Sequence, residues 1–146
     1  MKNILIIYGT TTGNSEKIAH MSGDILANNF SVSIKNCADL PSSYAFDKDI
    51  YLFATSTWGI NPASLQEDFE IFWLQSNKKS IFGKKFVLLG LGDDSYPFFC
   101  GGIDILETEI LENGGIVLNS PLKINDSAVH KRNLLEDYLQ KTLDKI

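Results

Sequence analysis

The sequence predicts an α/β fold: a three-layer sandwich in which helices cover both faces of a five-stranded parallel sheet. Apolar runs of strand length alternate along the chain with segments whose apolar residues recur at helical spacing. This alternation is typical of parallel sheets, and right-handed crossovers leave few topologies for it. For strands of this number and length we predict the doubly wound order 2-1-3-4-5, in which ligands bind beyond the carboxyl ends of the strands.

The first half of the chain contains three predicted strands and two predicted helices. The apolar run from Asn3 to Tyr8 ends at Gly9, so we expect a strand that is buried on both faces. Period and length predict the other segments: a helix over 14–28, strands over 31–35 and 49–54, and a helix over 65–74. The aromatic face of this last helix, formed by Phe69, Phe72 and Trp73, is expected to belong to the core.

The second half of the chain repeats the alternation. Its apolar pattern predicts a strand over 85–91, a helix over 102–113, a short strand over 116–118 and a closing helix over 127–145. Gly114 and Gly115 mark the end of the helix before them, because glycine readily adopts the left-handed conformation that terminates helices.

Length and cysteine content are those of a single cytoplasmic domain. A chain of 146 residues fits one domain, which we expect to span 1–146. Cys37 and Cys100 lie far apart and lack the spacing of metal ligands, so we predict reduced thiols and no metal site. The sequence shows neither a signal-peptide pattern nor an apolar run of membrane-spanning length. We therefore expect a soluble protein in the cytoplasm.

Acidic residues are concentrated in two parts of the chain. The net charge is −5, yet residues 87–113 contain six acidic side chains and no basic one, and residues 38–76 are also strongly acidic. Four lysines between 78 and 85 are expected to form a solvated turn. An acidic surface of this kind argues against nucleic acid and anionic membranes as partners, and it suits basic proteins.

The loop after the first predicted strand has the composition of an anion site. Gly9 to Ser15 contains three threonines, Asn14 and Ser15, and it leads directly into a predicted helix. Backbone N–H groups at a helix N-terminus attract anions, and Gly13 allows close approach of the backbone. The loop lacks the lysine of a nucleotide triphosphatase and the three-glycine dinucleotide pattern. A lone monophosphate remains as the ligand, with simple helix capping as the alternative.

Two further loops place one large aromatic residue each beyond a predicted strand end. Trp58 follows the third strand and Tyr96 follows the fourth. Because these strand ends meet at the switch point of the sheet, the two rings can form the walls of a slot for a flat ring system. Each aromatic alone could simply cover the sheet edge. Together with a phosphate loop, such a slot indicates flavin mononucleotide (FMN).

The chain resembles the short-chain flavodoxins over essentially its whole length. Three segments carry the resemblance: Tyr8-Gly9-Thr10-Thr11-Thr12-Gly13-Asn14-Ser15-Glu16, Ser56-Thr57-Trp58-Gly59 with Leu65 to Phe69, and Gly92-Asp93-Asp94-Ser95-Tyr96 with Phe99-Cys100-Gly101. The resemblance implies a flavodoxin-like fold for residues 1–146, with non-covalent FMN as the cofactor.

The resemblance also implies the cofactor contacts. The phosphate binders would come from the first loop: Thr10, Thr11, Thr12, Gly13, Asn14 and Ser15. Trp58 resembles the stacker on the inner face of the ring, and Tyr96 resembles the stacker on the outer face. Contacts to the ribityl chain and the ring edge would come from Ser56, Thr57, Gly59, Leu91, Gly92, Asp93, Phe99 and Cys100. Ile60 stands where the family often has glycine or a polar residue, which we expect to make the one-electron-reduced flavin less stable.

The implied function is low-potential transfer of single electrons between redox proteins, without substrate turnover by the protein itself. Asp93, Asp94, Glu67 and Asp68 would form an acidic rim that disfavours negative charge on the ring and guides basic partners, such as a flavodoxin reductase and an acceptor enzyme. The alternatives are an accessory flavin protein of the MioC kind, a flavin-dependent NAD(P)H:quinone reductase, and a flavin-free interaction domain.

Overall fold

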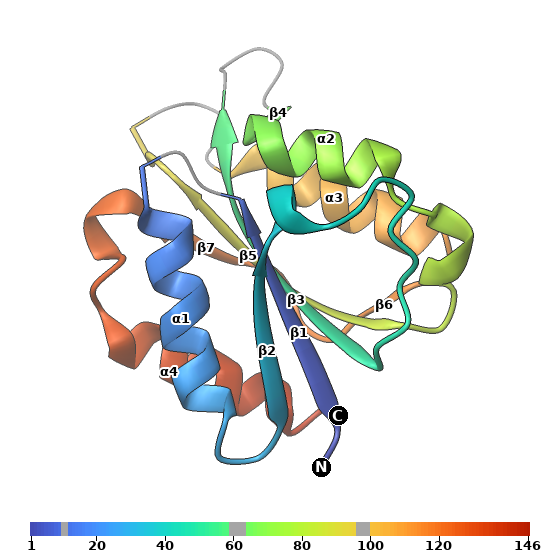
Figure 1. Cartoon of the computed structure of the whole chain (residues 1–146). Helices are drawn as coiled ribbons and strands as arrows, with labels where there is room; N and C mark the ends of the chain where they lie inside the picture. The colour runs from blue at the N-terminus through green and yellow to red at the C-terminus, as the bar shows by residue number, and fades with distance from the viewer. Residues whose placement is uncertain (10–11, 59–63, 96–99) are drawn as a thin grey trace.

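The computed structural model describes residues 1–9, 12–58, 64–95 and 100–146, with only the backbone of Trp58 and Ser64. Strands and helices alternate along these residues as predicted (Figure 1). The strands are β1 (Asn3–Gly9), β2 (Ser31–Asn36), β3 (Ile50–Trp58), β4 (Ser64–Leu65), β5 (Lys85–Gly92), β6 (Ile116–Val117) and β7 (Leu122–Asn125). The α-helices are α1 (Asn14–Leu26), α2 (Glu67–Gln75), α3 (Gly101–Glu112) and α4 (Arg132–Leu143). Three short 3-10 helices are η1 (Cys37–Asp39), η2 (Lys78–Ile81) and η3 (Asp126–Ala128).

The sheet has the doubly wound order that the sequence predicts. Neighbouring strands run β2-β1-β3-β5-β6, and each of these pairs is parallel. The last position is shared by two short strands, because β6 pairs with the start of β5 and β7 with its end. The sequence predicts only the first of these two strands. Four residues that follow Pro121 and include just Leu122 and Ile124 are too short a pattern to stand out.

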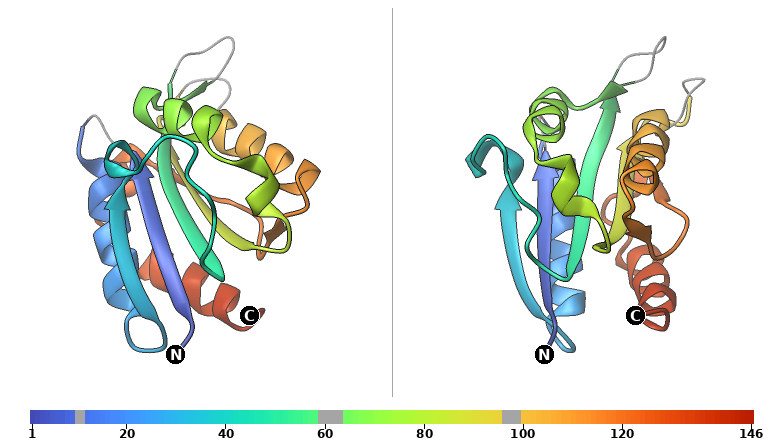
Figure 2. Two further views of the ribbon diagram at one scale, coloured as in Figure 1. Left: turned by 45° about the vertical axis from the view of Figure 1, so that its right-hand side comes forward. Right: turned by 90° about the vertical axis from the view of Figure 1, so that its right-hand side faces the viewer.

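The helices lie on both faces of the sheet. One face packs against α1 and α4, and the other packs against α2 and α3 (Figures 1 and 2). Successive residues of β1 alternate between the two cores: Ile4 and Ile6 face α1 and α4, whereas Leu5 and Ile7 face α2 and α3. Burial on both faces explains why this strand is apolar at every position from 4 to 7.

Aromatic side chains dominate the core beneath α2 and α3. Tyr51 and Phe86 stack with ring centroids 5.6 Å apart, and Phe46 meets Tyr51 edge-on at 5.0 Å. Phe69 and Trp73 on α2 are at most 2% exposed, and the buried Phe72 lies beside them, which confirms the prediction that this aromatic face is core. Such ring pairs contribute about 0.5–1.5 kcal/mol each beyond their buried area.

Two element boundaries differ from the predicted ones by more than two residues. Strand β3 continues four residues past the predicted end, because β4 pairs antiparallel with its last two residues, Thr57 and Trp58. Helix α4 begins at Arg132 instead of residue 127, because Asp126–Ala128 form a 3-10 turn. Val129 is buried as its apolar character suggests, but it lies before the helix.

No helix among the described residues is both long enough and apolar enough to cross a membrane.

Candidate functional site

Three loops begin at the carboxyl edge of the sheet. They follow β1, β3 and β5, whose last residues are Gly9, Trp58 and Gly92 (Figure 1, top). The chain termini lie at the opposite end of the molecule. Parallel pairing fixes this arrangement, because all three strands run in the same direction. The structure thus brings together the three loop positions that the sequence analysis singled out.

The first loop ends at the N-terminus of α1. Gly13 is the N-cap residue with φ of +93°, a conformation that side-chain-bearing residues rarely adopt, and the Gly13 carbonyl accepts the first helical bond from Lys17 N at 3.1 Å. A Cβ placed on Gly13 would meet no atom of the described residues within 4 Å. Thr12 is exposed, Asn14 is half-buried and Ser15 is buried. Thr10 and Thr11 lie outside the described residues.

The chemistry of this loop fits the phosphate of FMN. No described residue would contact a Cβ on Gly13 at the start of α1, and the helix dipole favours negative charge there. From Gly9 to Ser15 the sequence supplies hydroxyl and amide groups and no basic side chain. Neutral donors at a helix N-terminus suit one phosphate group better than a di- or triphosphate, whose recognition commonly adds a lysine or a metal ion.

The base of the first loop is tightly packed against α2. A Cβ on Gly9 would lie 2.6 Å from Gln66 Oε1 and 2.9 Å from Phe69 Cβ, so only glycine fits without displacement. Gln66 is the N-cap residue of α2, where its Oε1 accepts from Phe69 N at 3.0 Å. Gly9, the residue before the loop, is therefore held in place by its packing against α2 and the N-cap residue of that helix.

A hydrogen bond links β1, which precedes the first loop, to α1, which follows it. Tyr8 donates its hydroxyl to Glu16 Oε2 at 2.9 Å. Burial raises the pKa of Tyr8, and the Glu16 carboxylate raises it further. Tyr8 therefore stays a neutral donor that ties β1 to α1.

Two further hydrogen bonds hold the start of the second loop in place. Thr57 Oγ1 accepts from Gly102 N at 3.0 Å, which caps α3, and Gln66 N donates to the Ser56 carbonyl at 2.8 Å. The sequence analysis assigned Ser56 and Thr57 to the cofactor site, and the structure places both half-buried at its edge. Thr55 Oγ1 is buried and has no hydrogen-bonding partner among the described residues. The Trp58 side chain and Gly59 lie outside the description.

The third loop begins as a short polar turn. Leu91 and Gly92 are buried at the end of β5, and Asp93 and Asp94 follow them in solvent. Asp93 Oδ1 accepts from Ser95 N at 2.9 Å and from Ser95 Oγ at 2.6 Å. These hydrogen bonds lower the pKa of Asp93, so its negative charge is held at neutral pH. Tyr96 and Phe99 are outside the described residues.

Cys100 closes the third loop as the N-cap of α3. Its backbone is left-handed, with φ of +52° and ψ of +30°, and its side chain is 1% exposed. Burial raises the pKa of its thiol to about 12. Cys100 is therefore a neutral packing residue at the floor of the site.

One residue that sequence reasoning missed, Asn125 at the end of β7, connects this strand to the third loop. Asn125 Oδ1 accepts from Asp94 N at 3.1 Å. Partial burial raises the pKa of Asp126; the Asn14 side chain opposes that rise and the Asp93 charge adds to it. The sequence carries no local signal for the contact of Asn125 with Asp94, because 31 residues separate Asp94 from Asn125.

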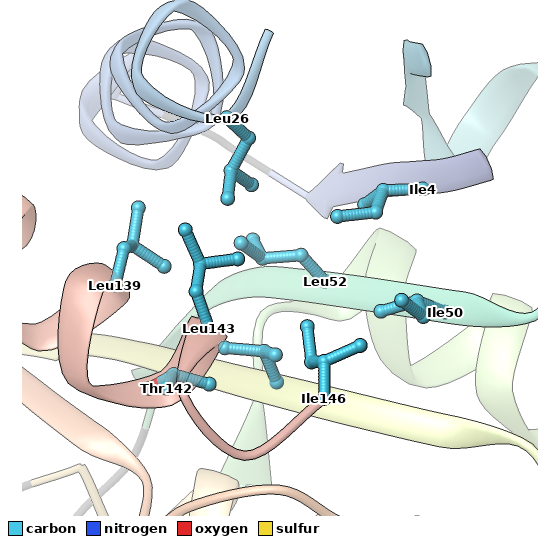
Figure 3. Close-up of a pocket in the computed structure, with 9 residues that line it drawn as sticks. Ile4, Leu26, Ile50, Leu52, Leu139, Thr142, Leu143 and Ile146 are labelled. Carbon is cyan, nitrogen blue, oxygen red and sulfur yellow. The ribbon is translucent and has the colours of Figure 1, made fainter. Parts of the chain in front are cut away.

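An apolar hollow elsewhere in the molecule does not have the character of this site. It lies between α1, α4 and the sheet, where Leu26, Leu52 and Leu143 point toward one another and Ile146 closes one side (Figure 3). Thr142 is the one polar residue in its lining, and its hydroxyl already donates to the Tyr138 carbonyl. The hollow is therefore a gap in core packing.

The doubly wound sheet and the phosphate-type loop at its switch point define a mononucleotide-binding α/β protein. The family model described as Flavodoxin matches residues 6–138. A flavodoxin of Maridesulfovibrio salexigens is 37% identical over 131 residues, covering 86% of this chain and 87% of the relative. The MioC protein of Escherichia coli is 32% identical over 131 residues, covering 86% and 84%.

Solved structures show the same fold. A flavodoxin of Streptococcus pneumoniae matches with a TM-score of 0.84 at 24% identity, covering 99% of each chain. A flavodoxin of Fusobacterium nucleatum, solved with bound flavin mononucleotide, matches with a TM-score of 0.75 at 19% identity, covering 100% of this chain and 99% of that one. The chain belongs to the flavodoxin family.

Proposed function

We propose that this protein is a low-potential one-electron carrier that holds FMN non-covalently in a single domain over residues 1–146. The observation that carries the proposal is the N-terminus of α1 at the switch point of the sheet, where the sequence from Gly9 to Ser15 supplies only neutral donors for a monophosphate. Membership of the flavodoxin family supports the same cofactor and the same role in electron transfer.

The three loops would divide the binding of FMN between them. We assign the phosphate to the first loop, through Thr10, Thr11, Thr12, Gly13, Asn14 and Ser15. We assign the faces of the ring to Trp58 and Tyr96. The ribityl chain and ring edge would meet Ser56, Thr57, Gly59, Leu91, Gly92, Asp93, Phe99 and Cys100. Among the described members of this set, Leu91 and Cys100 are almost completely buried and would exclude water from below.

Bound FMN supplies the redox chemistry, because its ring takes up and releases single electrons. The chain would tune that chemistry by charge and solvent exclusion. Asp93 keeps its negative charge through the two Ser95 bonds, and Asp94 stands exposed beside it. Negative charges near the ring disfavour a further negative charge on it, which lowers the potential of the second electron.

The acidic rim would also select the redox partners. Glu67 and Asp68 lie exposed at the start of α2, and Asp93 and Asp94 lie exposed after β5. A basic protein, such as a flavodoxin reductase or an acceptor enzyme, would dock on these carboxylates in a brief, salt-sensitive encounter. We propose that the protein acts as a monomer in the cytoplasm and turns over no substrate of its own. Its free, buried Cys37 and Cys100 are in keeping with a reducing compartment.

An accessory role like that of a MioC protein is the second candidate, favoured by the 32% identity to that protein. The carrier is preferred because a flavodoxin is 37% identical over the same share of the chain. Reduction by a flavodoxin reductase, followed by electron release to a second protein, would support the carrier.

A visible spectrum of the purified protein, followed by stepwise anaerobic reduction, tests the proposal. We expect two flavin bands, reduction in two separate one-electron steps, and a second potential below that of free FMN. A flavin reduced in one two-electron step would favour the accessory role. Oxidation of NAD(P)H by the protein alone would support the alternative that it is a flavin-dependent NAD(P)H:quinone reductase. A colourless protein that does not bind added FMN would overturn the cofactor assignment.

A further inference from the structure

A groove of about 230 Å³ lies between the segment that follows β2 and helix α2. One wall includes Cys37, Leu40 and Pro41, and the other includes Asp68, Ile71 and Phe72. Among the described residues, the lining has one carboxylate and no basic side chain. Apart from Asp68, none of these residues belongs to the segments that carry the family resemblance.

Hydrogen bonds hold both walls of the groove in place. At the start of the first wall, Asn36 Oδ1 accepts from Ala38 N at 3.0 Å. Beyond its end, Ser43 N donates to the Gln75 carbonyl at 2.9 Å, and Ser42 Oγ donates to Gln75 Oε1 at 3.3 Å. The segment after β2 is thus tied to the last residue of α2. A preformed groove of this kind lowers the entropic cost of binding.

The groove exposes apolar side-chain surface. Ile71 is 48% exposed, and Leu40 is half-buried against the core that contains Phe72. A single exposed isoleucine is common on protein surfaces, but this one stands in the wall of a hollow. Pockets for small molecules commonly measure about 300–1,000 Å³. The smaller groove suits one or two apolar side chains of a protein partner, whose burial is favourable.

The charge around the groove is negative. Residues 36–47 and 49–77, from which both walls come, contain six acidic side chains and no basic one. Asp39 is exposed directly after Ala38, and Asp68 is exposed in the other wall. Asp68 also belongs to the acidic rim, so the groove continues the surface on which redox partners are proposed to dock. Charge complementarity favours a basic partner over an acidic one.

We propose that this groove receives a basic segment of the redox partner, which inserts an apolar side chain against Ile71 and Leu40. Lysine or arginine side chains of the same segment would lie beside Asp39 and Asp68. The carboxylates guide the encounter, and the apolar contact adds affinity that salt does not screen. The inference rests on the proposed role in electron transfer.

Two synthetic peptides separate the apolar contact from the charge. One is rich in lysine and contains two leucines, and in the other both leucines are replaced by serine. At about 0.5 M salt we expect the FMN-loaded protein to bind the leucine peptide on the order of tenfold more tightly than the serine peptide. Ile71→Ser should abolish this preference. Leu74→Ser is the matched control, because Leu74 is a 70% exposed residue of α2 outside the groove lining.

Amide chemical shifts locate the bound peptide. The amides of Ala38, Leu40 and Ile71 should shift on titration with the leucine peptide, whereas that of Leu139 in the opposite core should not. If the groove receives the redox partner, the leucine peptide should also slow reduction of the protein by a flavodoxin reductase several-fold more than the serine peptide does.

The outcomes distinguish the groove from the proposed function. Equal affinity for the two peptides, an unchanged preference in Ile71→Ser, or equal effects on the reductase would overturn the proposal. A wild-type dimer that Ile71→Ser alone converts into a monomer would overturn it too and assign the groove to a second copy of the chain. A protein that binds the leucine peptide in the groove but binds no FMN would instead reject the proposed function.

Discussion

At the scale of single residues, the two cysteines show how burial controls chemistry. Cys37 is 2% exposed and Cys100 is 1% exposed, and burial raises the pKa of each thiol to about 12. The reactive form of cysteine is the thiolate, which is therefore scarce at any physiological pH. Both thiols should be inert in the folded protein.

Alkylation with iodoacetamide at pH 8 tests this expectation. We expect no adduct on the native protein over an hour and two adducts after unfolding in urea, measured by intact mass. Because the folded-state pKa values lie above those of the unfolded chain, the stabilisation from both thiols is present below about pH 8.5 and is lost as pH rises toward 12. Rapid modification of the native protein at pH 8 would contradict the assigned burial.

The glycine at the base of the first loop gives a second residue-scale prediction. Gly9→Ala should lower the free energy of unfolding by about 1–3 kcal/mol, because the new Cβ would lie 2.6 Å from the buried Gln66 Oε1. Gly23→Ala is the matched control. Its Cβ would lie 2.8 Å from Cδ1 at the flexible end of Ile34 and at an ordinary contact distance of 3.7 Å from Val32 Cγ1, and alanine favours the helix by up to about 1 kcal/mol. Denaturant midpoints that shift equally for both variants would contradict this account.

At the scale of elements, one side-chain pair joins α2 to α3. Trp73 Nε1 donates to Glu109 Oε2 at 2.7 Å, and Lys78 Nζ lies 4.5 Å from the centre of the Trp73 ring and donates to the Trp73 carbonyl. The lysine was expected in a solvated turn, but it is half-buried against the ring. Burial lowers the pKa of Lys78 and the Glu109 charge opposes that shift.

Replacing the tryptophan measures what this link contributes. Trp73→Phe keeps a ring in the core but removes the donor, so we expect a loss of about 1.5–3 kcal/mol in the free energy of unfolding. Glu109→Gln keeps an acceptor oxygen and should cost less. Urea unfolding of both variants provides the measurement, and an equal or larger loss for Glu109→Gln would contradict the assigned bond.

Long, strongly apolar elements were predictable from sequence, whereas two of the short strands, β4 and β7, were not. Strand β5 is buried at all but its first residue, so its apolar run was visible without any structure. Strand β4 has two residues and exists through pairing with the end of β3, which no local pattern shows. The positions of the site loops were predictable because strand ends fix them. The bonds of Thr57 to Gly102 and of Asn125 to Asp94 were not, because they join residues far apart in sequence.

At the scale of the whole molecule, charge is distributed unevenly about the site. Asp93 and Asp94 follow the last residue of β5, Glu67 and Asp68 begin α2, and all four are exposed. A hollow at the amino-terminal ends of β1, β3 and β5 is instead lined by Lys2, Lys84 and Lys85, together with Asp49. The molecule therefore presents its negative end where the flavin edge is proposed to lie.

Electron transfer to a basic cytochrome tests the effect of this charge. We expect the bimolecular rate of the FMN-loaded protein to fall several-fold between about 0.05 and 0.5 M salt. Asp93→Asn/Asp94→Asn should reduce both the rate at low salt and its salt dependence. Asp24→Asn/Asp144→Asn changes the net charge equally at exposed positions elsewhere and should change both less. Equal effects of the two double variants would show that net charge alone matters.

The divided last strand of the sheet also bears on solubility. Open sheet edges invite strands of neighbouring molecules to pair with them, which is a route to fibrils. Alongside the eight residues of β5 the edge offers only the two residues of β6 and the four of β7, interrupted between them. A foreign strand would find no long continuous ladder there. Joining β6 and β7 into one uninterrupted strand should therefore make the protein more prone to self-assembly at high concentration.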